Sequence, residues 1–307
     1  MGSRSDELRK RLEALNGGPL AKPPKADAPR AVTRAVPSVE PLSRQPIQFS
    51  RTLPHTVAPP TFGSLQLDKI VRLEDAVTGE EVTVEPHGRA FVVTTVVREL
   101  GGNWGPTLAS LQRLLTTPDS PLQHHFAAHG APVAPEDLLF VDLETTGLGS
   151  SPLFLIGTLT WEGEELVARQ YLARHYGEEA AVTKLFADLM RTKRLLVTFN
   201  GKSFDLPYVR VRAAAHRIRL GPELLHFDLL HVCRRHWKGR LPNCKLQTLE
   251  LHVCGRARTG DIPGSEIPDA YHAYVRTENA AALVDILHHN LLDLVTMAEL
   301  LTRLPSP

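Results

Sequence analysis

The sequence predicts an α/β protein with a mixed central sheet flanked by helices, and three features support that prediction. Short apolar runs typical of buried strands recur between residues 138 and 199. Longer stretches with apolar residues three and four positions apart, typical of amphipathic helices, alternate with them. The order is three hairpin-joined strands, a helix and one more strand, which indicates a sheet with both antiparallel and parallel pairs.

The first elements of this region are three predicted strands. Residues 138–143, 154–161 and 166–172 are apolar runs of strand length. Turn-forming residues at 150–152 and 162–163 separate them, so we expect hairpin-like connections.

Helices are predicted after these strands. At 178–191, Ala181, Leu185 and Leu189 fall on one helix face, and a strand is predicted at 195–199. Further helical segments are predicted at 206–218, 227–237, 246–253 and 280–304. The last of them has an apolar side formed by Leu283, Ile286, Leu287, Leu291 and Leu294.

Composition divides the chain into three predicted parts: an N-terminal segment at 1–63, a lead-in region at 64–134 and a main domain at 135–307. Residues 19–60 contain ten prolines and few large apolar side chains. Such a segment cannot bury enough surface to offset its ordering entropy, so we expect a disordered linker. A short helix at 6–15 is a candidate site for a protein partner.

The lead-in region has its own pattern of strands and helix. Residues 81–85 and 90–97 predict two strands joined by a turn at 86–88, and residues 107–115 predict a helix. We expect a small α/β unit that packs on the main domain.

Bulk composition excludes several classes of protein. The chain is 42% hydrophobic and 22% charged, has no run of 18 apolar residues typical of a membrane span, and lacks the apolar core of a secretory signal. Its cysteines, Cys233, Cys244 and Cys254, form no C-x-x-C pair. This pattern predicts reduced thiols in a cytoplasmic protein, without a disulfide framework or a zinc site.

The most informative motif is Asp-Leu-Glu at 142–144, directly after the apolar run 138–141. Side chains two apart on a strand point to the same face, so Asp142 and Glu144 project together. Neighbouring carboxylates repel each other unless a cation neutralises them, and oxygen ligands suit Mg²⁺ or Mn²⁺. For this pair alone, polar residues at the exit of a buried strand are the alternative explanation.

Two later motifs add acids. The strand 195–199 is followed by Asn-Gly-Lys-Ser-Phe-Asp, which places Asp205 at a strand-to-helix turn. The last helix carries Asp293 shortly after His288 and His289. Three acidic motifs in this order are not readily explained by chance, and together they predict one site.

Basic residues are concentrated in one part of the chain, although the net charge is only +1. Residues 191–240 contain twelve lysines and arginines against three acids, 12 − 3 = +9. A basic segment beside a carboxylate cluster is typical of a polyanion site. The alternative is that these charges are solvated and never converge.

At these motifs the chain resembles the RNase H-like (DnaQ-like) exonucleases with four acidic residues, called DEDD exonucleases, and among them a branch called YprB-like. The segments that carry the resemblance are 142–148, 200–205, 226–231, 261–264 and 289–290. The resemblance implies an RNase H-like fold and a 3′→5′ exonuclease that uses two Mg²⁺ or Mn²⁺ ions. It also implies single-stranded DNA or RNA as substrate and nucleoside 5′-monophosphates as products.

Transferred residue by residue, the resemblance implies four metal-binding acids: Asp142, Glu144, Asp205 and Asp293. A histidine of the last helix would accept the proton of the attacking water. The superfamily places it five residues before the last acid, which indicates His288. Positions i and i+4 share a helix face, which indicates His289. We favour His289 and keep both.

Substrate contacts are predicted after both strand ends. The predicted contact residues are Thr145, Thr146, Gly147, Leu148, Asn200, Lys202 and Phe204. For three of them a structural role is the alternative: a loop anchor for Leu148, a helix cap for Asn200 and a core position for Phe204. Four further aromatic residues are candidates either for base stacking or for the core: Tyr208, Trp237, Tyr271 and Tyr274.

Two other functions remain open. A catalytically idle nuclease fold would serve as a nucleic-acid-binding or scaffold module, and an endonuclease would cut within a strand. The presence of all four acids favours an enzyme. No residue can be singled out as a sensor of the 2′-hydroxyl, so the sequence does not distinguish DNA from RNA.

Overall fold

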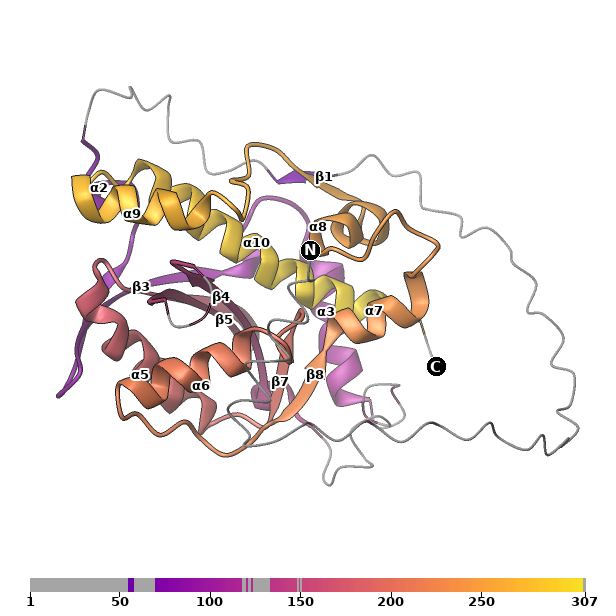
Figure 1. The fold of residues 1–307 in the computed structure, drawn as a ribbon. Helices are drawn as coiled ribbons and strands as arrows, with labels where there is room; N and C mark the ends of the chain where they lie inside the picture. The colour runs from indigo at the N-terminus through magenta and orange to yellow at the C-terminus, as the bar shows by residue number, and fades with distance from the viewer. Residues whose placement is uncertain are drawn as a thin grey trace, which may run out of the picture. The chain divides into compact units, whose positions relative to one another are not determined.

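A seven-stranded mixed sheet forms the centre of the computed structural model, which describes residues 55–57, 70–117, 120, 123, 133–147, 149 and 151–305 (Figure 1). In spatial order the strands are β2 (Glu80–Val84), β3 (Gly88–Val96), β6 (Glu165–Leu172), β5 (Leu153–Glu162), β4 (Leu138–Thr145), β7 (Leu195–Thr198) and β8 (Leu225–Asp228). Neighbours from β2 to β4 are antiparallel, whereas β4, β7 and β8 are parallel. The predicted mixed α/β fold is confirmed.

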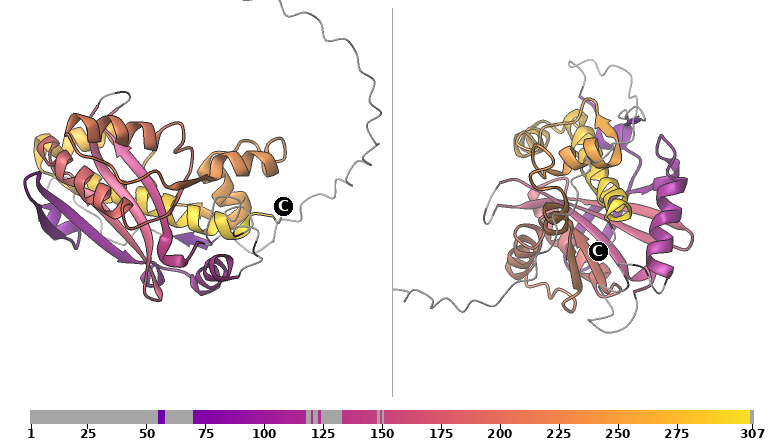
Figure 2. Two further views of the ribbon diagram at one scale, coloured as in Figure 1. Left: turned by 90° about the horizontal axis from the view of Figure 1, so that it is seen from below. Right: turned by 90° about the vertical axis from the view of Figure 1, so that its right-hand side faces the viewer.

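Helices lie on both faces of this sheet. Figures 1 and 2 show α5 and α6 on one face and α10 on the other. The helices are α2 (Leu73–Ala76), α3 (Gly105–Thr116), α5 (Glu179–Met190), α6 (Asp205–Ala215), α7 (Leu229–Trp237), α8 (Leu246–Leu249), α9 (Ile267–Thr277) and α10 (Ala281–Arg303). Short 3₁₀ segments are η1 (Val97–Glu99), η2 (Pro135–Asp137) and η3 (Tyr176–Glu178), and η4 (Glu250–Cys254) is a π-helix.

The connections explain the strand directions. Short turns join β4 to β5 and β5 to β6, and Gly163 in the second turn has a positive φ of 60°, which suits glycine. Parallel neighbours need a longer crossover. The segment between β4 and β7 includes α5, and α6 links β7 to β8.

Alternation along β4 decides which residues meet α10. Leu139 and Val141 belong to the core that contains α5, whereas Leu138 and Phe140 belong to the core formed with α3 and the C-terminal part of α10. Asp142 continues the second series, so its side chain faces α10. The fold thereby directs the first acidic motif toward the helix that carries the last one.

Most predicted elements of the main domain are confirmed. The strands expected at 138–143, 154–161, 166–172 and 195–199 are β4, β5, β6 and β7, with ends shifted by one or two residues. The helices expected at 178–191, 206–218 and 280–304 are α5, α6 and α10, and the lead-in elements are β2, β3 and α3.

Two predicted helices were wrong in part. Residues 227–237 begin as the end of β8, and α7 starts only at Leu229. Residues 246–253 divide into α8 and the π-helix η4. The sequence analysis also missed α9 and β9 (Arg256–Arg258). The missed strands are short and depend on long-range pairing, as β8 pairs with β7 and β9 with β1.

Residues near the N-terminus contribute to two sheets. β2 and β3 of the lead-in region extend the central sheet, because β3 pairs with β6. β1 (His55–Val57) pairs in parallel with β9. The predicted linker at 19–60 lies outside the described residues except for β1, and the predicted helix at 6–15 lies outside them entirely.

The four aromatic residues considered for base stacking are all buried. Their exposed fractions are 6% for Tyr208, 5% for Trp237, 0% for Tyr271 and 8% for Tyr274. Tyr271 stacks on Phe154 with 3.8 Å between ring centroids, and its hydroxyl donates to the carbonyl of Ala173 at 2.8 Å. They belong to the core and present no free face to a base.

α10 is a core helix. It is long and apolar enough to cross a membrane by length and composition, but 72% of its most apolar window is buried inside the fold. It packs on β4, β5 and β6. Its apolar surface is therefore accounted for by contacts within the molecule.

We expect Gly157→Ala to destabilise the fold. A Cβ at this position on β5 would overlap the side chain of Asn290 on α10. Overpacking of this kind costs about 1–3 kcal/mol of the free energy of unfolding. Urea denaturation measures it. Gly264→Ala is the matched control, because its Cβ would meet no atom within 4 Å. Equal stability of the two variants would contradict the close contact between β5 and α10.

Candidate functional site

Four carboxylates from three segments converge at the end of β4. Asp142 and Glu144 lie on β4, Asp205 is the first residue of α6, and Asp293 lies in the middle of α10. Burial raises the pKa of Asp142 well above its usual range, and the charges of Asp293, Glu144 and Asp205 raise it further. The structure therefore brings the acids of all three motifs together.

Burial and mutual repulsion affect the whole cluster. Burial raises the pKa of Glu144 to about 8, and Asp293 and Asp205 add to this rise, while His289 opposes it. Burial also raises the pKa of Asp205 to about 7, and the charge of Asp228 adds to it. A bound cation would relieve this repulsion.

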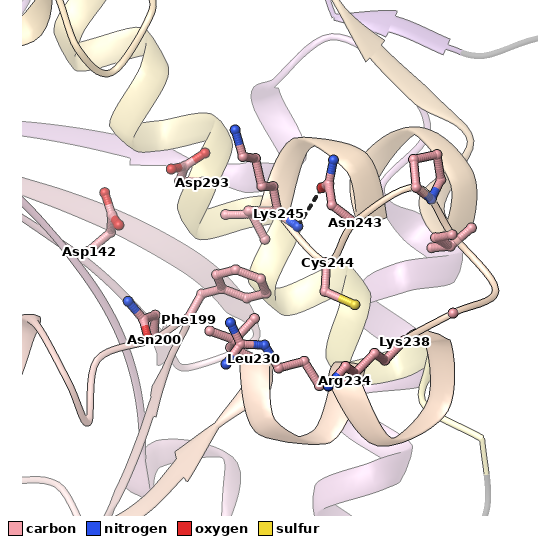
Figure 3. A pocket seen from close by; sticks show the side chains of 14 residues that line it. Asp142, Phe199, Asn200, Leu230, Arg234, Lys238, Asn243, Cys244, Lys245 and Asp293 are labelled. Carbon is pink, nitrogen blue, oxygen red and sulfur yellow. Dashed lines mark hydrogen bonds between the residues drawn. The ribbon is translucent and has the colours of Figure 1, made fainter.

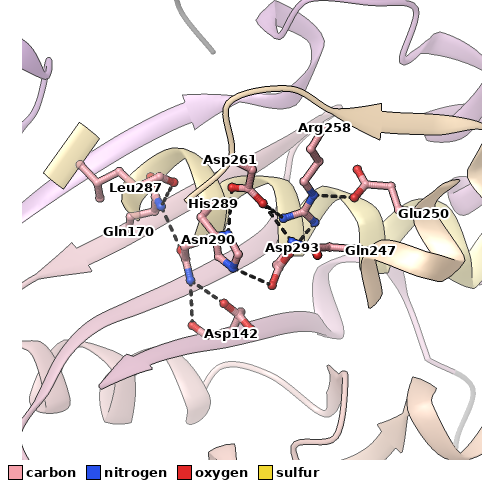
Figure 4. A network of polar contacts seen from close by, with 10 residues as sticks. All are labelled: Asp142, Gln170, Gln247, Glu250, Arg258, Asp261, Leu287, His289, Asn290 and Asp293. Atoms are coloured by element: carbon pink, nitrogen blue, oxygen red, sulfur yellow. Dashed lines mark hydrogen bonds and ion pairs between the residues drawn. The ribbon is translucent and has the colours of Figure 1, made fainter. Parts of the chain in front are cut away.

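Asn290 holds the carboxylate of Asp142 from the side of α10 (Figure 4). Its amide nitrogen donates to Asp142 Oδ2 at 2.8 Å and to the Asp142 carbonyl at 3.3 Å. Gln170 on β6 donates to Asn290 Oδ1 at 2.9 Å and to the carbonyl of Leu287 at 2.8 Å. Asn290 is fully buried, so this chain of hydrogen bonds determines its orientation and that of Asp142.

Arg258 on β9 is the cation within the cluster (Figure 4). Its guanidinium donates to Asp293 Oδ1 at 2.5 Å, to Glu250 Oε2 at 2.5 Å and to Asp261 Oδ2 at 3.1 Å. Its side chain is only 6% exposed, so three carboxylates replace water around the charge. Arg258 thereby orients Asp293, the acid contributed by α10.

The two adjacent histidines of α10 have different surroundings. His289 Nδ1 lies 2.9 Å from Asp261 Oδ1, and its Nε2 lies 3.7 Å from Asp293 Oδ2. Burial favours a lower pKa for His289, but the hydrogen bond with Asp261 and the charges of Asp293 and Glu144 outweigh it and raise the pKa. Burial lowers the pKa of His288, whose Nε2 has no hydrogen-bond partner among the described residues. His289 is the histidine that faces the acids.

Asp228 organises the turn that leads to Asp205. Its carboxylate accepts hydrogen bonds from the backbone nitrogens of Asn200 at 2.8 Å, Lys202 at 3.0 Å and Leu230 at 3.1 Å. Asn200 has a positive φ of 70°, which this carboxylate supports. Asp228 is thus committed to structure, and its position places the first turn of α6 beside the end of β4.

The predicted substrate contacts after β4 form part of a closed turn. Thr145 Oγ1 donates to the Gly147 carbonyl at 2.8 Å, and Thr146 Oγ1 donates to the Pro152 carbonyl at 3.1 Å. Leu148 lies outside the described residues. Both threonine hydroxyls already have partners within the turn.

The other predicted contacts occupy three different environments. Phe204 is half-buried and packs against Tyr208, with 5.5 Å between ring centroids. Lys202 is exposed. Asn200 lines a pocket, and its side chain makes no capping bond to α6, whose N-cap residue is Phe204.

A pocket of about 630 Å³ opens beside the acids (Figure 3). Asp142 and Asp293 line one side of it, and Arg234 and Lys238 of the α7 region line another. Phe199 lies between them, at the end of β7. The pocket thus joins the carboxylate cluster to part of the basic stretch.

The donor set fits hard divalent cations, which nucleases of the RNase H type use. Among the residues that the structure describes, no three His, Cys, Asp or Glu side chains form a ready-made metal site. Asp293 faces Arg258 and Asp142 faces Asn290 instead. Each carboxylate retains further lone pairs, and a cluster of oxygens without thiolates suits Mg²⁺ or Mn²⁺. The four acids would hold such ions.

The family follows from comparison with known proteins. A model of the RNase_H superfamily matches residues 139–305, more than half of the chain, so the chain belongs to the RNase_H superfamily. The matched region contains all four clustered acids, together with Asn290 and Arg258. Members of this superfamily are often nucleases, and these typically use divalent metals.

Each relative matches only part of this chain, and the match covers only part of the relative. The uncharacterized protein YprB of Bacillus subtilis (strain 168) is 36% identical over 186 residues, which are 59% of this chain and 44% of that protein. A DNA polymerase of Pyrococcus glycovorans is 27% identical over 176 residues, 47% of this chain and 22% of the polymerase. The chain thus spans less than half the length of these relatives.

One solved structure shows a weaker likeness. The family B DNA polymerase from the archaeon Pyrobaculum calidifontis is 18% identical and has a TM-score of 0.45, over 55% of this chain and 24% of the polymerase.

Several residues of the site were given no role by the sequence analysis. Gln170, Glu250 and Arg258 belong to no recognisable sequence motif. Asp261 and Asn290 belong to segments that carry the family resemblance, which was the available signal, but a motif does not say which side chain touches which. Asp261 meets His289 across 28 residues, and Asn290 meets Asp142 across 148.

We expect the stability of the metal-free protein to fall as pH rises. The pKa of Glu144 goes from 4.5 to about 8 on folding, so folding takes up a proton between these values. The contribution of Glu144 to the free energy of unfolding is therefore fully present below pH 4.5 and is lost as the pH rises through about 8. Thermal denaturation between these pH values, in EDTA and in Mg²⁺, measures the effect.

Mg²⁺ is expected to raise the melting temperature most at the alkaline end of this range. Asp142→Asn removes one charge of the cluster, so the pH dependence and the response to Mg²⁺ should both decrease. Asp269→Asn on the exposed side of α9 is the control. A wild-type stability that responds neither to pH nor to Mg²⁺ would contradict the repulsion described for the cluster.

Proposed function

We propose that this chain is a metal-dependent 3′→5′ exonuclease that hydrolyses phosphodiester bonds of single-stranded nucleic acid and releases nucleoside 5′-monophosphates. One observation carries the proposal: four carboxylates from distant segments meet beside His289 at the edge of a pocket with a basic wall. Membership of the RNase_H superfamily supports it, as does a relative that is a DNA polymerase.

The four acids serve as metal ligands in this proposal. Two divalent ions would lower the pKa of the attacking water and stabilise charge on the phosphate and the leaving oxygen. Asp142, held by Asn290, would bind these ions together with Glu144, Asp205 and Asp293. Release of the proposed 5′-monophosphate requires the 3′ oxygen of the preceding nucleotide to leave.

His289 is the proton acceptor in this proposal. Its Nδ1 faces Asp261, so a proton on Nδ1 leaves Nε2, on the side of Asp293, free to accept. Asp261 also stabilises the imidazolium that forms when the water loses its proton. Arg258 links the partner of His289 to the metal-binding acids, because it donates to both Asp261 and Asp293.

A second candidate function is a nucleic-acid-binding module without catalysis. The ion pair between Arg258 and Asp293 favours it, because a permanent guanidinium at this acid would compete with a metal ion. The four intact acids and the histidine favour the enzyme. Binding without cleavage in the wild type would support the module.

We expect the protein to shorten a 5′-labelled single strand stepwise from its 3′ end in Mg²⁺ or Mn²⁺. Asp142→Asn should reduce the rate more than about 100-fold, because a direct metal ligand contributes more than the 10–100-fold typical of the residues around it. Gel electrophoresis of single- and double-stranded DNA and RNA measures both the activity and the substrate class.

Asp269→Asn is the control for this experiment, since it removes an exposed carboxylate from α9. A circular single strand distinguishes the modes of cleavage, because an exonuclease cannot begin without an end. Linearisation of the circle would indicate an endonuclease, and full activity of Asp142→Asn would refute the assignment of the metal site.

We expect Asp261→Asn to change the pH dependence of cleavage. Asp261 raises the pKa of His289, so its loss lowers that pKa and shifts the acidic limb of the pH–rate profile to lower pH. The rate at the optimum should fall about 10–100-fold. A variant with a reduced rate and an unshifted profile would show that Asp261 acts on structure alone.

A further inference from the structure

The basic stretch at 191–240 divides into two groups in the structure. One group bonds to other parts of the fold, so its charges are already partly neutralised. Its members are Arg191 with Asp188, Lys193 with the carbonyl of Glu136, Arg194 with Asp137, Arg210 with Glu223 and Arg212 with Glu179. The predicted convergence of the whole stretch on one polyanion site is thus not what the structure shows.

Arg234 and Lys238 belong to the other group. They lie one helical turn apart, on α7 and at its C-cap, and both are exposed and line the pocket beside the acids. Neither forms an ion pair with another described residue. Lys245, at the start of α8, lines the same pocket and is also exposed. Three cations therefore face one pocket.

The pocket is electrically asymmetric. Figure 3 shows Asp142 and Asp293 on one side, and Arg234 and Lys238 across the ring of Phe199 on the other. Such a pocket suits a ligand with one negative group near Arg234 and Lys238 and a second near the acids, which would hold divalent ions. A chain of phosphodiesters meets this requirement because it places negative charges at regular intervals.

The walls between these charges are suited to bases. Phe199, Leu230 and Leu246 line the pocket and offer apolar surface, and an aromatic ring provides a stacking platform. A volume of about 630 Å³ is of the size of small-ligand sites and too small for a duplex. These features favour a few unpaired nucleotides as occupant.

We propose that this pocket is the binding site for the single strand upstream of the scissile bond. Arg234 and Lys238 contact its backbone phosphates, and an unpaired base lies against Phe199. The inference rests on the proposed nuclease function for the direction of the strand. It adds a specific path: the strand leaves the acids toward α7, rather than over Arg191 at the end of α5 and the arginines of α6.

The test is strand binding by a pair of matched double variants. Arg234→Ala/Lys238→Ala removes two charges from the pocket, and Arg235→Ala/Arg240→Ala removes two exposed charges from the same segment outside it. Fluorescence anisotropy with a labelled single strand in Ca²⁺, at several salt concentrations, gives the affinity. A gel confirms that the strand stays intact, and thermal denaturation confirms that both variants fold.

We expect the pocket variant to bind roughly tenfold more weakly, and its plot of log affinity against log salt to be less steep by about 1.4, or about 0.7 for each lost phosphate contact. The control variant should keep the wild-type slope. Equal weakening of both variants would indicate a diffuse basic surface, and unchanged binding of the pocket variant would place the strand elsewhere. Either result overturns the inference.

Separate readouts distinguish this inference from the proposed function. Cleavage in Mg²⁺ or Mn²⁺ tests the nuclease, whereas affinity in Ca²⁺ tests the pocket. A further experiment measures whether a nucleoside 5′-monophosphate displaces the labelled strand in Ca²⁺. Binding of the monophosphate with no binding of the strand would reassign the pocket to a single nucleotide and refute the strand path.

Discussion

The arrangement of this protein depends on the close approach of four carboxylates, of which Asp205 is buried and the other three are half-buried. Alternation along β4 directs Asp142 and Glu144 toward α10, while the turn held by Asp228 and the middle of α10 bring Asp205 and Asp293 to them. Burial, with the charges of neighbouring acids, raises the pKa of Asp142, Glu144 and Asp205, so keeping these acids ionised costs stability. A fold that retains such a cluster in its core region must either compensate the charge internally or receive cations from solution.

Two residues of the fold stabilise the negative charges of the cluster, and they do so by different interactions. At Asp142 the interaction is neutral: the amide of Asn290, oriented by Gln170, donates to one oxygen. At Asp293 it is cationic, because Arg258 donates directly to the carboxylate. The neutral side leaves the charge of its acid in place for a metal ion, whereas the cationic side would have to share its acid. A catalytic protein would need Asp293 to bind a metal ion, whereas in a binding module without catalysis Asp293 could remain paired with Arg258.

The strongest local patterns predicted the structure well. The apolar run before Asp142 predicted β4, and the spacing of the two acids predicted that they share a face. β8, β9 and α9 escaped prediction, because four-residue strands depend on their neighbours and α9 begins beyond an irregular loop. Tyr271 had seemed available for stacking on a base, but its ring stacks on Phe154 in the core. The spacing of apolar residues along a helix does not show which side chain of another element an aromatic ring will pack against.

Local patterns in the amino-acid sequence were sufficient for most elements of the main domain, for the acidic motifs and for the family, because these depend on residue types at short spacing. The tertiary structure turns His289 rather than His288 toward the acids, as the i, i+4 spacing indicated, and it alone decided which basic residues remain available to a ligand. Both choices depend on contacts between distant segments. His289 meets Asp261 across 28 residues, and Arg212 is taken by Glu179 across 33. Spacing within a helix indicates which residues share a face, but it does not show which side chain from a distant segment meets that face.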